Sequence, residues 1–245
     1  MLVAKLSISK QGGLIDNKTR VYIMKVIRSA VSNFFIAFLF SLIWVVSCVA
    51  DENTGEVYIK AGEQLYNQNC VFCHQADAIG KPGLAPSLTS EELLATASDK
   101  FFLATIRDGR PGTGMPPFAH LEEGSIKAII AFLRSHSKLP NRAAEIDSQP
   151  DAHGDPRLGK QWFGQICATC HGKKGDGYAA GGTGTAIGKI GFLGKVSDGF
   201  IRTTIKNGRS NTRMLGFTGA DGLANLSDQE IDDIIVYLRS LPNSN

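Results

Sequence analysis

The chain has 245 residues, 43% hydrophobic and 20% charged, a composition that excludes an intrinsically disordered chain and allows one or two folded domains. Of its 26 basic and 23 acidic residues, six bases and one acid lie within residues 1–48, which leaves 20 bases and 22 acids beyond them. Because this remainder is slightly acidic, nothing in it indicates a nucleic-acid-binding surface.

The N-terminal segment, residues 1–48, is predicted to be a signal sequence. Its apolar run FFIAFLFSLIWVV (34–46) is interrupted by one serine and follows two basic residues, as in a secretory signal. The run ends just before Cys48 in a sequence that resembles a bacterial lipobox, so cleavage there and acylation of Cys48 are expected. An uncleaved membrane anchor is the alternative, because residues 30–50 match the length of about 20 residues that spans a bilayer core. In both cases we expect an exported chain, tethered to the membrane on its periplasmic side.

The rest of the chain repeats itself. Three segments occur twice, 97 to 105 residues apart, and the pairs are 61–74 with 158–171, 102–115 with 200–214, and 126–135 with 231–240. We therefore expect two copies of one domain, residues 57–139 and residues 157–245. Residues 140–156 contain three prolines and four acids and little that could form a core, which predicts a linker.

Each copy is predicted to be helical, so that the expected fold class is all-α. Apolar residues in 126–133 recur at the i, i+3, i+4, i+7 spacing of an amphipathic helix, and residues 231–238 repeat this spacing. Ser227 and Glu230 are spaced as a capping box that would begin the second of these helices. No alternating strand pattern of useful length is found, and the glycine-rich segment 181–194 is interpreted as a loop.

Four of the five cysteines belong to two C-x-x-C-H segments, 70–74 and 167–171. Two thiols three positions apart can form thioethers with the two vinyl groups of one haem, and the histidine that follows can bind the iron. A redox dithiol or half of a zinc site is the alternative for either segment alone. Because the two segments lie in register in a repeated, exported chain, we expect two haem c groups. The predicted attachment residues are Cys70, Cys73, Cys167 and Cys170, and the predicted proximal iron ligands are His74 and His171.

The second protein ligand of each iron is predicted by elimination. Beyond the signal segment the chain has two methionines, Met115 and Met214, one after each motif. No histidine follows His171, so Met214 is the ordinary haem ligand left in the second copy. In the first copy His120 and His136 remain as rivals, and Met115 is favoured because the aligned position in the second copy is also methionine.

Each copy resembles the class I cytochrome c fold, and the whole resembles a tandem dihaem cytochrome c. In that family the N-terminal helix crosses the C-terminal helix through a glycine and an aromatic residue. The matching residues here are Gly62 and Tyr66, facing Phe132, and Gly159 and Phe163, facing Tyr237.

The resemblance also implies a proline whose carbonyl holds the proximal histidine. Pro86 fits this role in the first copy. The second copy has no proline between Pro156 and Pro242, so another carbonyl must accept the proton of His171.

A Gly-Arg pair precedes each methionine in the alignment of the copies, at Arg110 and at Arg209. The glycines are expected to adopt positive φ. A guanidinium suits carboxylates, so the two arginines are candidate partners of the haem propionates. Solvated surface arginines are the alternative.

Two protein ligands on each iron leave no open site for a substrate, so we expect a carrier or relay of electrons with no catalytic residue, rather than an enzyme. The expected partners are a redox donor and a redox acceptor protein, together with the membrane. A cytochrome subunit of a larger dehydrogenase or reductase is one alternative, and a dihaem peroxidase-like enzyme is another. Residues 51–139 carry a net charge of −3 and residues 157–245 a net charge of +4, which suggests that Lys173 and Lys174 help the second copy to dock an acidic partner.

Overall fold

The computed structural model describes residues 54–219 and 222–241, together with the single residues 18, 22 and 25. Apart from those three residues, the predicted signal segment lies outside the described residues, and so does Cys48. Within the described ranges, no helix is both long enough and apolar enough to cross a membrane. Residues 56–245 form one compact unit that contains both copies of the repeat.

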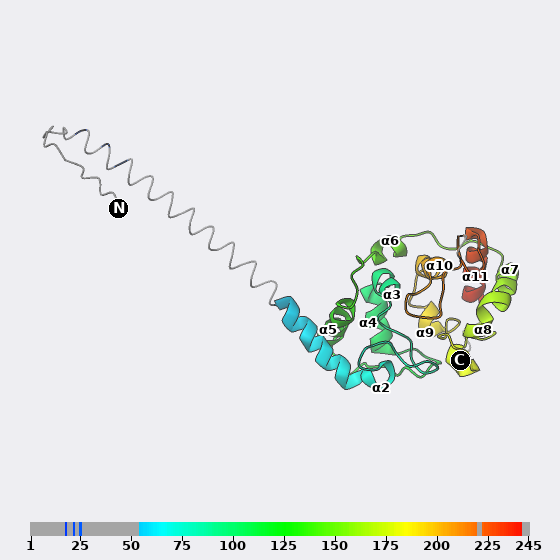
Figure 1. The fold of residues 1–245 in the computed structure, drawn as a ribbon, viewed down its shortest axis with the longest axis horizontal. Helices are drawn as coiled ribbons and strands as arrows, with labels where there is room; N and C mark the ends of the chain where they lie inside the picture. Colours follow the sequence, from blue (N-terminus) through cyan, green and yellow to red (C-terminus); the bar gives the residue numbers. More distant parts are fainter. Residues whose placement is uncertain (1–17, 19–21, 23–24, 26–53, 220–221, 242–245) are drawn as a thin grey trace, which may run out of the picture. The chain divides into compact units, whose positions relative to one another are not determined.

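The regular elements of the described residues are helices (Figure 1). The described part of the chain also has one isolated β-bridge, between Lys81 and Ala85. The first copy contains a helix over residues 54–69, then α2 (Val71–His74), α3 (Glu91–Thr96), α4 (Asp99–Asp108) and α5 (Glu123–Arg134), and α6 (Ala143–Asp147) follows it. The second copy contains α7 (Pro156–Trp162), the π-helix η1 (Phe163–Cys167), α8 (Ala168–His171), the 3-10 helix η2 (Gly177–Ala180), α9 (Ile190–Leu193), α10 (Asp198–Asn207) and α11 (Asp228–Ser240). The predicted all-α fold class is confirmed.

The helix starts follow from polar side chains that accept hydrogen bonds from otherwise unpaired backbone N–H groups. Ser98 caps α4 and Ser197 caps α10, each by accepting a hydrogen bond from the N–H three residues further on. The capping box predicted at Ser227 and Glu230 is present at the start of α11. Because α4 and α10 begin with the same kind of serine cap, they are equivalent helices of the two copies.

The first and last helices of each copy cross at a glycine. A Cβ atom on Gly62 would lie 1.9 Å from the carbonyl oxygen of Ala128, and one on Gly159 would lie 1.9 Å from that of Asp233. Only a residue without a side chain allows two helix backbones to approach so closely.

An aromatic pair lies beside each crossing, as the resemblance implied. The ring centroids of Tyr66 and Phe132 are 5.3 Å apart, and those of Phe163 and Tyr237 are 5.4 Å apart. Tyr66 and Phe163 are fully buried, so these pairs form the centre of each small apolar core.

We predict that Gly62→Ala lowers the free energy of unfolding by about 2–3 kcal/mol, because the added methyl group overlaps the Ala128 carbonyl and forces the helices apart. Urea unfolding followed by circular dichroism measures the loss. Gly124→Ala is the matched control, since Gly124 also lies in a helix and a Cβ there meets no atom within 4 Å. Equal stability of the two variants would contradict the close crossing.

One arginine in each copy ties the C-terminal helix to the rest of its domain. Arg134 forms an ion pair with Asp99 at the start of α4, and Arg239 forms one with Asp198 at the start of α10. Each guanidinium also donates to two backbone carbonyls around the end of α3 or α9. These matched networks extend the repeat to contacts that the aligned segments did not indicate.

Two regions predicted to be irregular contain helices. The segment predicted as a linker, 140–156, includes α6, which contributes two buried residues, Ala143 and Ile146, to the core. These two residues are spaced three apart, so that even a five-residue helix presents an apolar face. The glycine-rich segment 181–194 likewise ends in α9, because Phe192 is buried there.

The two copies pack against each other through equivalent helices. Phe101 of α4 and Phe200 of α10, which occupy the same position in the repeat, stack with ring centroids 5.6 Å apart and an interplanar angle of 29°. Phe192 of α9 meets the edges of both rings. Contact between equivalent residues is typical of an approximately two-fold interface.

Candidate haem sites

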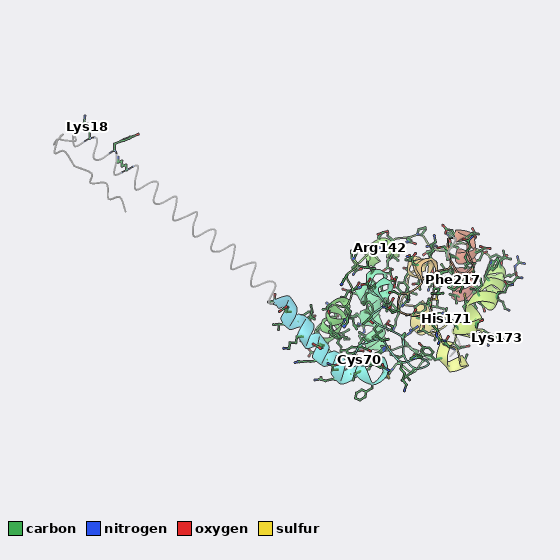
Figure 2. All side chains as sticks on the ribbon, viewed as in Figure 1. Lys18, Cys70, Arg142, His171, Lys173 and Phe217 are labelled. Atoms are coloured by element: carbon green, nitrogen blue, oxygen red, sulfur yellow. The ribbon has the colours of Figure 1, made fainter. Side chains whose placement is uncertain are left out.

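Each C-x-x-C-H segment forms one helical turn after a longer helix. In the first copy the N–H groups of Cys73 and His74 both donate to the carbonyl of Cys70, at 3.2 and 2.9 Å. In the second copy Cys167 ends η1 and Cys170 lies in α8. The turn therefore brings the two thiols of each pair to one side of the chain, directly before the histidine. Figure 2 labels Cys70 in the first copy and His171 in the second.

The two histidines are oriented by backbone carbonyls. The Nδ1 atom of His74 lies 3.0 Å from the carbonyl oxygen of Pro86, as predicted, and Nδ1 of His171 lies 2.7 Å from that of Thr185. Burial lowers the pKa of both imidazoles, which favours the neutral form. With the proton on Nδ1 donated to the carbonyl, the lone pair on Nε2 is available to a metal.

Thr185 is the carbonyl that the sequence left unidentified. Its loop approaches His171 closely, since a Cβ on Gly184 would lie 2.7 Å from the imidazole Cε1. A Cβ on Gly182 would lie 2.2 Å from the carbonyl oxygen of Cys170. The cluster of glycines in this loop is the sequence signal of that close approach, although it does not reveal which carbonyl accepts.

The cysteines do not have the electrostatics of a redox dithiol. Burial, together with the neighbouring cysteine, raises the pKa of Cys70 to about 11 and that of Cys167 to about 12, whereas reactive dithiols have lowered values. The structured part of the chain also contains no group of three or more His, Cys, Asp or Glu residues that could hold a metal ion. Both findings favour haem attachment over the two alternatives.

The two methionine loops have the same construction. The N–H of Arg110 donates to the carbonyl of Met115 at 3.1 Å, and the N–H of Arg209 donates to that of Met214 at 2.7 Å. In each loop a threonine hydroxyl also donates to the arginine carbonyl at 2.8 Å. The glycines before the arginines, Gly109 and Gly208, have the expected positive φ of 66° and 69°.

Both methionines are partly buried and pack against the apolar core. The rivals in the first copy differ from them, because His120 and His136 are exposed. His136, two residues beyond the end of α5, also has its Nδ1 atom 3.0 Å from the carbonyl oxygen of Phe132 in that helix. The surroundings therefore favour Met115 over either histidine.

Arg110 and Arg209 lie at the interface between the copies. Nη2 of Arg110 donates to the carbonyl of Ala186 in the second copy at 2.6 Å, and its guanidinium lies over Phe192 at 5.1 Å from the ring centroid. The guanidinium of Arg209 lies over Phe200 at 5.4 Å. Burial lowers the pKa of each arginine to about 10. The alternative of solvated surface arginines is therefore wrong.

These guanidinium groups are not paired directly with a carboxylate. Among the described residues neither forms an ion pair, and Nε of Arg110 is buried with no hydrogen-bond partner there. The charge of Glu92 raises the pKa of Arg209, but the two side chains form no ion pair. The two groups also repel each other, since Arg110 contributes to the lowered pKa of Arg209. Unpaired buried charge is costly, so the site fits a ligand that brings carboxylates, as haem does with its propionates.

A helical fold with C-x-x-C-H turns, carbonyl-bound neutral histidines and methionine loops is that of a c-type cytochrome, present here twice. Comparison with protein families agrees with this class. Residues 58–133 match the family described as cytochrome c oxidase, cbb3-type, subunit III, and residues 157–242 match the cytochrome c family. The chain belongs to the dihaem c-type cytochromes, with two cytochrome c domains in tandem, and it binds two haem c groups covalently.

Three relatives illustrate the similarity. The chain is 35% identical over 152 residues to the cbb3-type cytochrome c oxidase subunit CcoP of Rubrivivax gelatinosus, covering 61% of this chain and 45% of the relative. It is 24% identical over 206 residues to the subunit FixP of Sinorhizobium medicae, covering 80% and 65%. It is 30% identical over 138 residues to the cytochrome bc1 complex cytochrome c subunit of Mycobacterium tuberculosis, covering 54% and 48%. The chain thus spans between about half and two thirds of the length of these relatives.

Proposed function

We propose that this protein relays electrons through two haems, each held by one copy of the repeat. Each haem would supply a reversible one-electron couple at its iron. The chain would contribute two thioether bonds, a histidine ligand and a methionine ligand at each site. These residues are Cys70, Cys73, His74 and Met115 in the first copy, and Cys167, Cys170, His171 and Met214 in the second.

Two observations support this ligand set. The histidines keep Nε2 free because Nδ1 is bound to a carbonyl. The methionines are partly buried in loops of identical construction, whereas His120 and His136 are exposed. With both axial positions of each iron taken by protein atoms, no coordination position would be left for a substrate. A carrier is therefore favoured over a peroxidase-like enzyme.

We further propose that Arg110 and Arg209 pair with haem propionates. Their burial without ion pairs and the unpartnered Nε of Arg110 support this assignment. Charge-assisted hydrogen bonds from a guanidinium to a carboxylate would offset the cost of burying these groups.

The observation that carries the relay proposal is the interface between the copies. The loop of Arg110 belongs to the first haem site, and it contacts Ala186 and Phe192 of the second copy. The two sites are thus built against a shared, well-packed boundary rather than separated by a flexible linker. Such an arrangement favours passage of electrons from one haem to the other within the chain.

A role as the cytochrome subunit of a larger oxidase or reductase complex is the second candidate. It is favoured by the printed names of the relatives, which are subunits of cbb3-type oxidases and of a bc1 complex. Copurification from detergent-solubilised membranes tests it, since a free-standing carrier would be recovered without oxidase or reductase subunits.

The basic side chains beside the second haem site offer a docking surface. Lys173 and Lys174 are exposed and lie two and three residues after His171, and Figure 2 labels His171 and Lys173. We predict that reversing both charges with glutamate slows oxidation of the reduced protein by ferricyanide about tenfold at low salt, because steering of the anion is lost. Stopped-flow measurement over a range of ionic strength should show the difference shrinking as salt screens the charges.

The cationic oxidant tris(phenanthroline)cobalt(III) is the control for this experiment. Its reduction should not be slowed by the same charge reversal. Equal slowing with both oxidants, or a rate difference that ignores salt, would contradict a docking role for Lys173 and Lys174.

The anchoring proposal is an exported protein held at the membrane through acylated Cys48. We predict that Cys48→Ser abolishes acylation and releases the protein into the soluble periplasmic fraction, because its lipid attachment point is gone. Fractionation and intact mass measure both effects. A variant that stays in the membrane with residues 1–47 attached would show instead that the segment is an uncleaved anchor.

A further inference from the structure

A lysine of the second copy reaches into the first. Lys195, just after α9, donates from Nζ to the carbonyls of Ala104 and Gly109, each at 2.8 Å, and lies 3.6 Å from Oδ2 of Asp108. Its side chain is 12% exposed, so these contacts are largely shielded from solvent. All three partners lie in the last five residues of α4 or directly after it, near the helix end whose unpaired carbonyls attract a cation.

The partners of Lys195 form the base of the first methionine loop. Gly109 opens this loop, and a Cβ on Gly109 would lie 2.8 Å from the carbonyl oxygen of Met115, which closes it. The next residue, Arg110, donates its N–H to that same carbonyl. By binding the Gly109 carbonyl, Lys195 therefore fixes the backbone where the two ends of the loop meet.

A carboxylate of the first copy makes the converse contact. Oε2 of Glu92, in α3, accepts the N–H of Ser210 at 2.6 Å and the hydroxyl of Ser90 at 3.0 Å. Ser210 follows Arg209, whose N–H donates to the carbonyl of Met214. Burial alone would raise the pKa of Glu92, but the hydrogen bonds from Ser210 and Ser90 hold it below its usual value, so the carboxylate is ionised at neutral pH.

These two contacts are not copies of each other. The position equivalent to Lys195 in the first copy is Thr96, and the position equivalent to Glu92 in the second is Gly191. Each copy therefore supplies a different charged group, and each group meets the backbone of the other copy's methionine loop. Adhesion between the copies is already provided by the stacked rings of Phe101 and Phe200 and does not require either contact.

We propose that Lys195 and Glu92 are positioning residues through which each domain holds the loop that carries the other domain's axial methionine. Ligation of each haem then depends on the neighbouring domain. This inference rests on the proposed assignment of Met115 and Met214 as iron ligands. Both residues contact the backbone at the base of a methionine loop and neither is a proposed haem ligand, so each would act through the loop.

The test measures how readily imidazole displaces methionine in the oxidised full-length protein, followed as loss of the far-red methionine–iron absorption band. Displacement requires the loop to open. We expect Lys195→Leu to accelerate one of the two kinetic phases by about tenfold or more, because opening no longer breaks hydrogen bonds to a charged group. Glu92→Ala should accelerate the other phase. The Met115→His variant identifies the phases, since it retains only the methionine of the second haem.

Lys127→Leu is the matched control, because Lys127 forms an exposed ion pair with Glu123 in α5, away from both loops. It should leave both rates unchanged. Lys195→Arg retains a cation with several donors and should restore most of the native rate, which a purely steric defect would not allow.

Unaltered displacement rates in Lys195→Leu and Glu92→Ala, with two haems bound and a native circular dichroism spectrum, would overturn the inference. Equal acceleration of both phases by Lys195→Leu would also overturn it, because general loosening would then be the cause. If Met115→His left the far-red band at full strength, the assignment of Met115 as an iron ligand would fail. This outcome is distinct from a failure of the proposed role of Lys195 and Glu92.

Discussion

Replacing both Cys70 and Cys73 with alanine is expected to leave one haem per chain instead of two. The two thioether bonds of the first haem need these thiols, and the second segment has its own pair in a separate helical turn. Intact mass and haem staining after denaturing electrophoresis measure the loss, because only covalently bound haem survives both. This variant has the largest expected effect, since it removes half of the cofactor content.

Val71→Ala is the control for the double cysteine variant, because it alters the same turn and keeps both thiols. It should retain two haems. A double cysteine variant that still carries two covalent haems, or a native chain that carries one, would contradict attachment at the first segment.

Substituting histidine for either methionine should lower the reduction potential of one haem by on the order of 100 mV, because a second imidazole stabilises Fe(III) more than a thioether does. Met115→His and Met214→His should each also remove about half of the far-red absorption band. Spectroelectrochemical titration of each variant measures both effects. His120→Ala is the control in the first domain and should change neither the potentials nor the band.

A raised reduction potential in His120→Ala, together with an unchanged far-red band in Met115→His, would transfer the ligand role to that histidine. The double methionine variant adds a second test. Ligands in independent domains would give additive shifts. Here Arg110 and Lys195 connect the first loop to the second copy, and Glu92 connects the second loop to the first copy. We therefore expect the shift in the double variant to depart from the sum of the single shifts.

Much of the fold was predictable because each domain is encoded twice. Gly62 and Gly159 mark the helix crossings in both copies, and the structure places each against a backbone carbonyl. The Pro86 carbonyl was also predictable, since a proline after the haem segment matched the family pattern and lies 3.0 Å from His74. A glycine or methionine at one position is a weak signal alone, but its recurrence at the equivalent position of the second copy makes the prediction firm.

The carbonyl that holds His171 was not predictable, because any residue can supply a backbone carbonyl. Thr185 makes this contact through its main chain, and its side-chain type carries no signal of it. Only the surrounding glycines hint at a close approach. The short helix α6 was not predictable for a related reason, since Ala143 and Ile146 are too few to form a recognisable periodic pattern, yet both are buried.

The contacts between the domains could not be read from the repeat. Aligned segments describe what the copies share, whereas Lys195 and Glu92 have no equivalents and gain their meaning from how the copies pack. The same holds for Arg110, for which the sequence left a propionate partner and a solvated surface position about equally open. Its interaction with Ala186 depends on an interface that neither copy contains alone.

Coulometric titration of the native full-length protein, with haem absorbance recorded at each potential, tests the central claim most directly. The account predicts two electrons per chain, taken up in two one-electron steps, and a far-red band of methionine-bound iron in the oxidised form that imidazole must displace. A total of one electron per chain would contradict the two-haem relay. An oxidised protein that lacks the far-red band and binds imidazole immediately would also contradict the account, because its irons would then have open coordination sites.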